Sequence, residues 1–152
     1  THPTGIVLWL TGLQPTSVFA YMNNLDLPLD VVNGILVRFA GGAIGTITAS
    51  GLLPPRGYIY QITIIGEEGT IIMDAATQSV LIRGKGDEQP RKIELTHEHT
   101  LAQVPRNFVR AILGEEEQYV PTDVAINEVR IIDGAYRSAA TGQEIILRTN
   151  SA

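Results

Sequence analysis

Cysteine is absent from the 152 residues of this chain. The chain therefore forms no disulfide bridge and offers no thiolate to a metal, and its composition suits a reducing compartment. Long apolar runs are absent too: none approaches the ~18 residues of a membrane-spanning helix, and no secretory signal peptide is visible. Hydrophobic residues make up 44% of the chain and charged residues 18%. We therefore expect a soluble, cytoplasmic, globular protein with a buried core.

Basic residues are too few to form a nucleic-acid surface. The formal net charge is −5, whereas a phosphate backbone is bound by clusters of Lys and Arg. We therefore expect no nucleic acid and no membrane among the partners.

Charged residues are scarce in the first half of the chain. Of the 27 charged residues, 23 lie between Glu67 and Arg148, and the first 66 positions hold only Asp26, Asp30, Arg38 and Arg56. Because a solvated surface needs charge, the first half is expected to be covered on nearly every side.

Hydrophobic periodicity predicts helices at both ends of the chain and strands between them. A helix over 3–11 ends at Gly12, and two further helices cover 105–114 and 121–142. Strands are expected over 16–22, 30–39, 43–50, 58–65, 70–74, 79–83, 91–95 and 144–147. The fold class is therefore α+β, with an open-faced, mostly antiparallel sheet and helices packed on one face.

The apolar pattern also predicts which surfaces are buried. The 121–142 helix is expected to bury a stripe of Ala125, Val129, Ile132, Tyr136 and Ala139. The strands over 31–39 and 58–65 carry apolar or uncharged side chains on both faces, whereas a sheet with one wet face alternates apolar with polar. Helices can cover one face, and a second copy of the chain is the expected cover of the other.

Three short segments could carry chemistry. The glycine-rich segments 41–45 and 84–86 lie between strand patterns, so they are interpreted as hairpin turns rather than phosphate-binding loops. His97 and His99 could bind a metal, but zinc needs three or four ligands, so a solvated loop is favoured. His2, at the entrance of a helix, could act as a general acid or base if it faces a cleft.

Four segments resemble the C-terminal domain of the Gfo/Idh/MocA family of NAD(P)-dependent oxidoreductases. They are HPTGIVLWLTG (2–12), FAGGAIGTITAS (39–50), YQITIIGEEGTIIMD (60–74) and AYRSAATGQEIIL (135–147). The first is similar to the helix that follows the family's D-x-x-x-H motif, and the others to its central hairpin, its G-x-x-G-t strand pair and its closing helix and strand. The four segments are distributed over nearly the whole chain, and the resemblance depends on their order and spacing together.

The resemblance implies a two-domain enzyme of which this chain is one part. An N-terminal Rossmann domain would bind NAD or NADP. Residues 1–152 would form the substrate-binding and oligomerisation domain, similar to the C-terminal domain of glyceraldehyde-3-phosphate dehydrogenase. The Asp of D-x-x-x-H and the family's catalytic Lys are not in this sequence. The chain therefore looks like an excised domain, binds no cofactor alone, and is expected to be inactive by itself.

Three residues receive roles from the resemblance. His2 matches the motif's histidine, which places or protonates the reacting oxygen of a sugar, polyol or related secondary alcohol. Tyr58 matches a substrate-contacting tyrosine of some family members, although a tyrosine at a strand start also serves packing. Arg56 could face an anionic or polyol substrate or be solvated. The alternative function is a stand-alone, non-catalytic dimerisation or ligand-binding module with the same fold.

Overall fold

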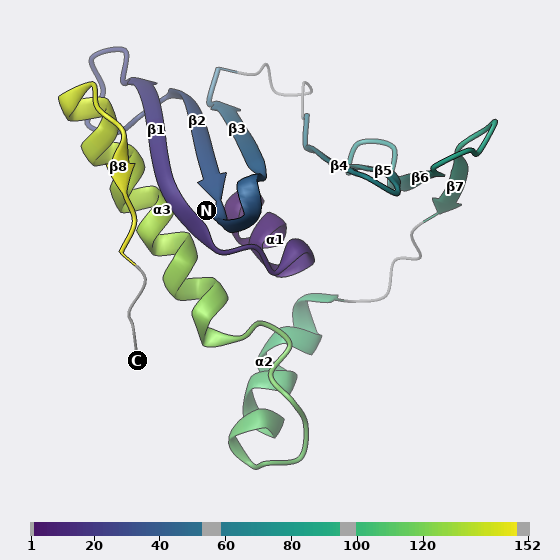
Figure 1. Ribbon diagram of the computed structural model, residues 1–152. Helices are drawn as coiled ribbons and strands as arrows, with labels where there is room; N and C mark the ends of the chain where they lie inside the picture. The colour runs from purple at the N-terminus through teal and green to yellow at the C-terminus, as the bar shows by residue number, and fades with distance from the viewer. Residues whose placement is uncertain (1, 53–58, 95–99, 149–152) are drawn as a thin grey trace. The chain divides into compact units, whose positions relative to one another are not determined.

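The computed structural model describes residues 2–52, 59–94 and 100–148 (Figure 1). The chain divides into two compact units, one formed by residues 1–52 and 120–152 and the other by residues 53–119.

The first unit is one antiparallel sheet with two helices. Its elements are α1 (His2–Thr11), β1 (Pro15–Asn23), β2 (Val32–Phe39), a short 3-10 turn η1 (Ala40–Gly42), β3 (Ile44–Ser50), α3 (Thr122–Thr141) and β8 (Ile145–Ile146). The strand order is β3-β2-β1-β8, with all neighbours antiparallel. The strands β2 and β3 are therefore a hairpin, as expected for the glycine-rich segment 41–45.

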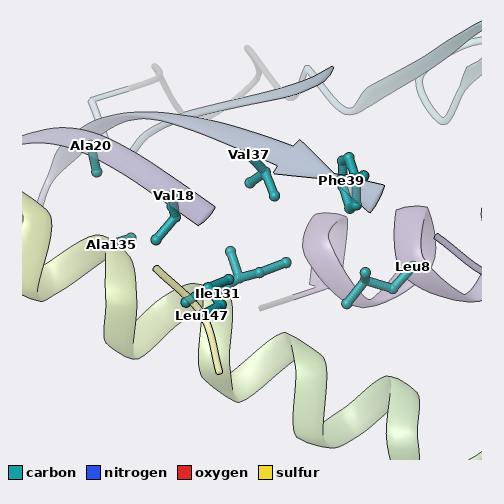
Figure 2. Packing of buried hydrophobic residues seen from close by; sticks show 8 residues of the cluster. All are labelled: Leu8, Val18, Ala20, Val37, Phe39, Ile131, Ala135 and Leu147. Carbon is teal, nitrogen blue, oxygen red and sulfur yellow. The ribbon is translucent and has the colours of Figure 1, made fainter. Parts of the chain in front are cut away.

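The core of this unit lies between the sheet and α3 (Figure 2). Side chains of β1 and β2 point toward the helix, and α1 closes one end through Leu8. The residues of the cluster are Leu8, Val18, Ala20, Val37, Phe39, Ile131, Ala135 and Leu147. Alternate strand residues point to opposite faces, so the remaining side chains of β1 and β2 point away from α3.

The predicted buried stripe of α3 is wrong at three positions. Val129 is 66% exposed and Tyr136 48% exposed, and Ala125 is exposed too. The helix instead buries Asn127, Ile131, Gly134, Ala135 and Ser138.

Close approach of the helix to the sheet explains this choice of small and polar residues. A methyl group on Gly134 would lie 2.6 Å from Cγ1 of Val18 and 2.8 Å from Cδ2 of Leu147. The hydroxyl of Ser138 accepts a hydrogen bond from the backbone N–H of Ala20 at 3.0 Å and donates to the carbonyl of Gln143 at 2.6 Å. Burial of a polar group is favourable only with such partners.

The second unit holds a second antiparallel sheet and α2. Its strands are β4 (Gln61–Gly66), β5 (Gly69–Asp74), β6 (Ser79–Gly84) and β7 (Arg91–Glu94), in the order β4-β5-β6-β7. The 84–86 segment therefore joins two antiparallel strands, as expected.

The helix α2 (Thr100–Ile112) begins earlier than predicted, with Pro105 inside it rather than at its start. The turn after α2 is fixed by Asn107, which donates to the carbonyl of Glu117 at 2.8 Å and accepts from the N–H of Tyr119 at 2.9 Å. Arg110 donates to the Glu116 carboxylate, and this bond lowers the pKa of Glu116 and raises that of Arg110.

The α+β fold class is confirmed, with antiparallel open sheets and α3 packed on one face of the first. In the described ranges the strands form two sheets of four. Strand and helix bounds otherwise lie close to the predicted ones.

Candidate functional site

A pocket of about 310 Å³ lies between α1 and the start of α3. Seven residues line it: His2, Gly5, Ile6 and Trp9 from α1, Val120 just before α3, and Val124 and Glu128 from α3. Apolar walls with a few convergent polar groups are typical of small-molecule sites. The polar side chains here are an imidazole, an indole N–H and a carboxylate.

The pocket wall of α1 follows from helical spacing. His2, Gly5, Ile6 and Trp9 occupy positions i, i+3, i+4 and i+7, which share one face of a helix. The helix ends at Gly12, whose φ of 64° is in the left-handed region and whose N–H donates to the Leu8 carbonyl at 2.9 Å.

Buried contacts hold α1 against α3. Leu8 is 3% exposed and Thr4 is 4% exposed, so the opposite side of α1 is well packed. Just after α1, Oε1 of the Gln14 side chain accepts a hydrogen bond from Nδ2 of Asn127 at 3.0 Å. Oδ1 of Asn127 in turn accepts a hydrogen bond from Arg130 at 3.1 Å. These bonds fix the first turns of α3, and with them Val124 and Glu128.

Glu128 lies directly over Gly5. A methyl group on Gly5 would lie 2.7 Å from Oε2 of Glu128 and 3.7 Å from its Oε1, so the carboxylate occupies the space that a side chain at position 5 would fill. Glu128 is half-buried. Over the part of the chain that the structure describes, no hydrogen bond or ion pair engages its carboxylate.

A second hollow, of about 410 Å³, lies where α3 meets the loop after β1. The Tyr136 hydroxyl donates to one oxygen of Asp30, and Nδ2 of Asn33 donates to the other at 2.6 Å. The bond from Tyr136 lowers the pKa of Asp30, and the same bond raises the pKa of Tyr136. Since both oxygens of Asp30 are engaged within the chain, we interpret this group as a tie between loop and helix.

The open face of the first sheet is largely apolar. Tyr21 is 73% exposed, Leu36 46%, Ile44 65% and Ile146 70%. The rings of Phe19 and Tyr21 meet edge to face, with centroids 5.0 Å apart. An ion pair lies on this face, between Nε of Arg38 and Oε1 of Glu144 at 3.6 Å. Exposed apolar patches of this kind are typical of protein–protein interfaces.

The structure places one of the three predicted site residues in the pocket. His2 lines it, whereas Arg56 and Tyr58 lie outside the described residues, as do His97 and His99. Sequence reasoning missed Glu128, because only the packing of α1 on α3 brings it to Gly5. The available signal was Gly5 itself, since a glycine inside a helix destabilises the helix by about 1 kcal/mol relative to alanine.

The two glycine-rich turns of the described residues join strands. The glycine-rich turns after β2 and β6 each lead into another strand, whereas a pyrophosphate cradle leads into a helix. Within residues 2–52, 59–94 and 100–148, no three His, Asp or Glu side chains gather as metal ligands. No helix in those ranges has the length and apolar character needed to cross a bilayer.

Part of the chain matches the sequence profile of a known domain family. Residues 1–72 match the profile of the GFO/IDH/MocA C-terminal domain. No curated protein matches the chain in sequence.

Solved structures match nearly the whole chain. An oxidoreductase domain protein from Kribbella flavida has a TM-score of 0.82 at 17% identity over 97% of this chain and 48% of its own. The aldose-aldose oxidoreductase from Caulobacter crescentus, complexed with glycerol, has a TM-score of 0.78 at 19% identity. The match covers 96% of this chain and 45% of that protein. The WlbA dehydrogenase from Bordetella pertussis, in complex with NADH and UDP-GlcNAcA, has a TM-score of 0.73 at 22% identity. The match covers 98% of this chain and 44% of that protein.

At these identities the structural similarity establishes the fold, and this chain spans less than half the length of each of the three. The profile match and the shared fold together confirm the resemblance seen in the sequence, which is to the C-terminal domain of the Gfo/Idh/MocA oxidoreductases.

Proposed function

We propose that residues 1–152 are the substrate-binding and oligomerisation domain of a cytoplasmic NAD(P)-dependent oxidoreductase. Its substrate would be a sugar, polyol or related secondary alcohol. The observation that carries the proposal is the pocket between α1 and α3, which presents His2 beside apolar walls in a domain of this family's fold. Two solved structures of similar fold contain UDP-GlcNAcA together with NADH, or glycerol.

His2 is proposed to hold the reacting oxygen and exchange its proton. Oxidation of an alcohol removes a hydride from carbon and a proton from oxygen, so a group that accepts the proton must lie at the oxygen. Imidazole suits this role because one ring nitrogen can accept a proton while the other donates a hydrogen bond. Arg56 and Tyr58 are proposed to contact the substrate.

The dinucleotide would be held outside this chain, by a preceding Rossmann domain. NAD or NADP, when bound there, accepts or donates the hydride. The residues of this chain bind and orient the substrate and hold its proton, and the isolated chain is expected to be inactive. The apolar open face of the first sheet supports oligomerisation through that face, because exposed apolar patches mark such interfaces.

Turnover by the longer polypeptide tests this function. A chain that includes the preceding domain should reduce NAD or NADP with at least one sugar or polyol, whereas residues 1–152 alone should not. His2→Gln should lower kcat by about 10²–10⁴-fold with a smaller change in KM. Asp133→Asn, on the exposed side of α3, is the control and should leave both constants unchanged.

Two results would contradict the proposal. A longer polypeptide that binds no dinucleotide and turns over no alcohol would favour the stand-alone dimerisation or ligand-binding module. An unchanged kcat in His2→Gln would remove His2 from the reaction.

A further inference from the structure

The His2 pocket contains two groups able to carry charge, His2 and Glu128, among otherwise uncharged lining residues. In the proposed reaction the imidazole of His2 exchanges the proton, and the carboxylate of Glu128 has no role.

Burial without a partner is the first observation. Glu128 is half-buried, and in the described ranges nothing donates a hydrogen bond to its carboxylate. Withdrawing a carboxylate from water destabilises a protein unless hydrogen-bond donors replace the water. A ligand in the pocket, which Glu128 lines, can supply those donors.

The glycine beneath the carboxylate is the second observation. Glycine destabilises a helix relative to alanine, yet Gly5 lies in the middle of α1. A methyl group there would come within 2.7 Å of Oε2 of Glu128. Gly5 thus keeps open the position in which the carboxylate faces the pocket.

We propose that Glu128 selects the ligand of the His2 pocket by charge. Its two oxygens accept hydrogen bonds from hydroxyl or ammonium groups and repel a carboxylate. The pocket therefore takes neutral or aminated sugars and polyols and excludes their acidic counterparts. This inference rests on the proposed function, because it takes the His2 pocket as the substrate site.

Trp9 reports directly on the pocket, because it lines the pocket and is the only tryptophan of the chain. The indole N–H signal of the ¹⁵N-labelled chain can be followed during titration with glucosamine, glucose and glucuronate in neutral buffer. These probes share one ring and differ in charge. Affinity should fall in that order, with glucuronate about fivefold or more weaker than glucose.

Three variants separate charge from structure. Glu128→Gln should reduce the preference for glucose over glucuronate to less than about twofold. Asp133→Asn removes a carboxylate from the exposed side of the same helix and should keep the wild-type order. Gly5→Ala keeps the charge but displaces it, so it should weaken glucose binding without unfolding the chain. Equal affinity for the three probes, no response of Trp9 to any of them, or wild-type selectivity in Glu128→Gln would overturn the proposal.

Failure here is distinguishable from failure of the proposed function. If the longer polypeptide oxidises alcohols but Glu128→Gln keeps wild-type discrimination, the selection by Glu128 is wrong and the function stands. If no alcohol is oxidised, the substrate role of the pocket is lost whatever Trp9 reports.

Discussion

The two faces of the first sheet are built from the same strands and have opposite surroundings. On β2, Val37 is 1% exposed beneath α3, while its neighbour Leu36 is 46% exposed on the other side. The covered face contacts Ile131 and Ala135, whereas the open face presents Tyr21, Ile44 and Ile146 to solvent. Apolar sequence alone therefore does not tell which face the chain covers itself. Exposed apolar faces are typical of interaction surfaces, and this is why we propose oligomerisation through the open face.

The largest difference between the two faces is expected in the free energy of unfolding when an apolar side chain on each face is shortened to alanine. Val37→Ala leaves a cavity in the core and should lower the free energy of unfolding by about 2–3 kcal/mol. Leu36→Ala removes a larger side chain but from the open face, and should cost a monomer less than about 1 kcal/mol. Urea unfolding at low protein concentration measures both. Equal losses for the two variants would abolish the contrast.

Glycine substitutions test how closely the covered face is packed. Gly134→Ala should destabilise by about 1–2 kcal/mol, because the new methyl meets Val18 and Leu147. Gly5→Ala should instead stabilise by about 0.5–1 kcal/mol, since the Glu128 side chain it meets can move. Thermal unfolding gives both signs. A stabilised Gly134→Ala would mean that α3 is loosely packed on the sheet.

A smaller, pH-dependent effect is expected from the Asp30–Tyr136 pair outside the core. The bond from Tyr136 lowers the pKa of Asp30 in the folded state below its ordinary 3.8. Its stabilisation is therefore present above that pH and is lost as pH falls through the lowered pKa. Because the pair is largely exposed, Tyr136→Phe should cost a few tenths of a kcal/mol at pH 7. The difference from wild type should shrink below pH 3.8.

The raised pKa of Tyr136 predicts a second loss of stabilisation, at alkaline pH. Stabilisation from its hydroxyl is present below its ordinary pKa of 10.0 and is lost as pH rises through the raised value. Urea unfolding of wild type and Tyr136→Phe across pH measures the loss of stabilisation at acid pH and at alkaline pH. A constant difference from acid to alkaline pH would show that this bond does not contribute.

Local patterns predicted most of the elements. Gly12 ends α1 because glycine adopts the left-handed conformation readily, and the 41–45 segment forms the β2–β3 hairpin for a related reason. The buried side of α3 was not predictable in this way. Its contact residues, Gly134 and Ser138 among them, suit a close helix–sheet approach that only tertiary packing defines.

The candidate site was predictable only in part. His2 was found through a motif, and the structure places it in a pocket. Glu128 required coordinates, because residues 5 and 128 are far apart in sequence and meet only when α1 packs on α3. The roles of Arg56 and Tyr58 stay predictions.

The mass of the chain in solution tests the central contrast most directly. Sedimentation equilibrium of residues 1–152 at micromolar concentration should give at least twice the 16.5 kDa of one chain, because in the proposed oligomer a second copy covers the open face. Ile44→Lys, which places a charge on that face, should return the mass to one chain while its thermal unfolding stays close to wild type. A wild-type chain that sediments as a stable 16.5 kDa monomer would contradict the account.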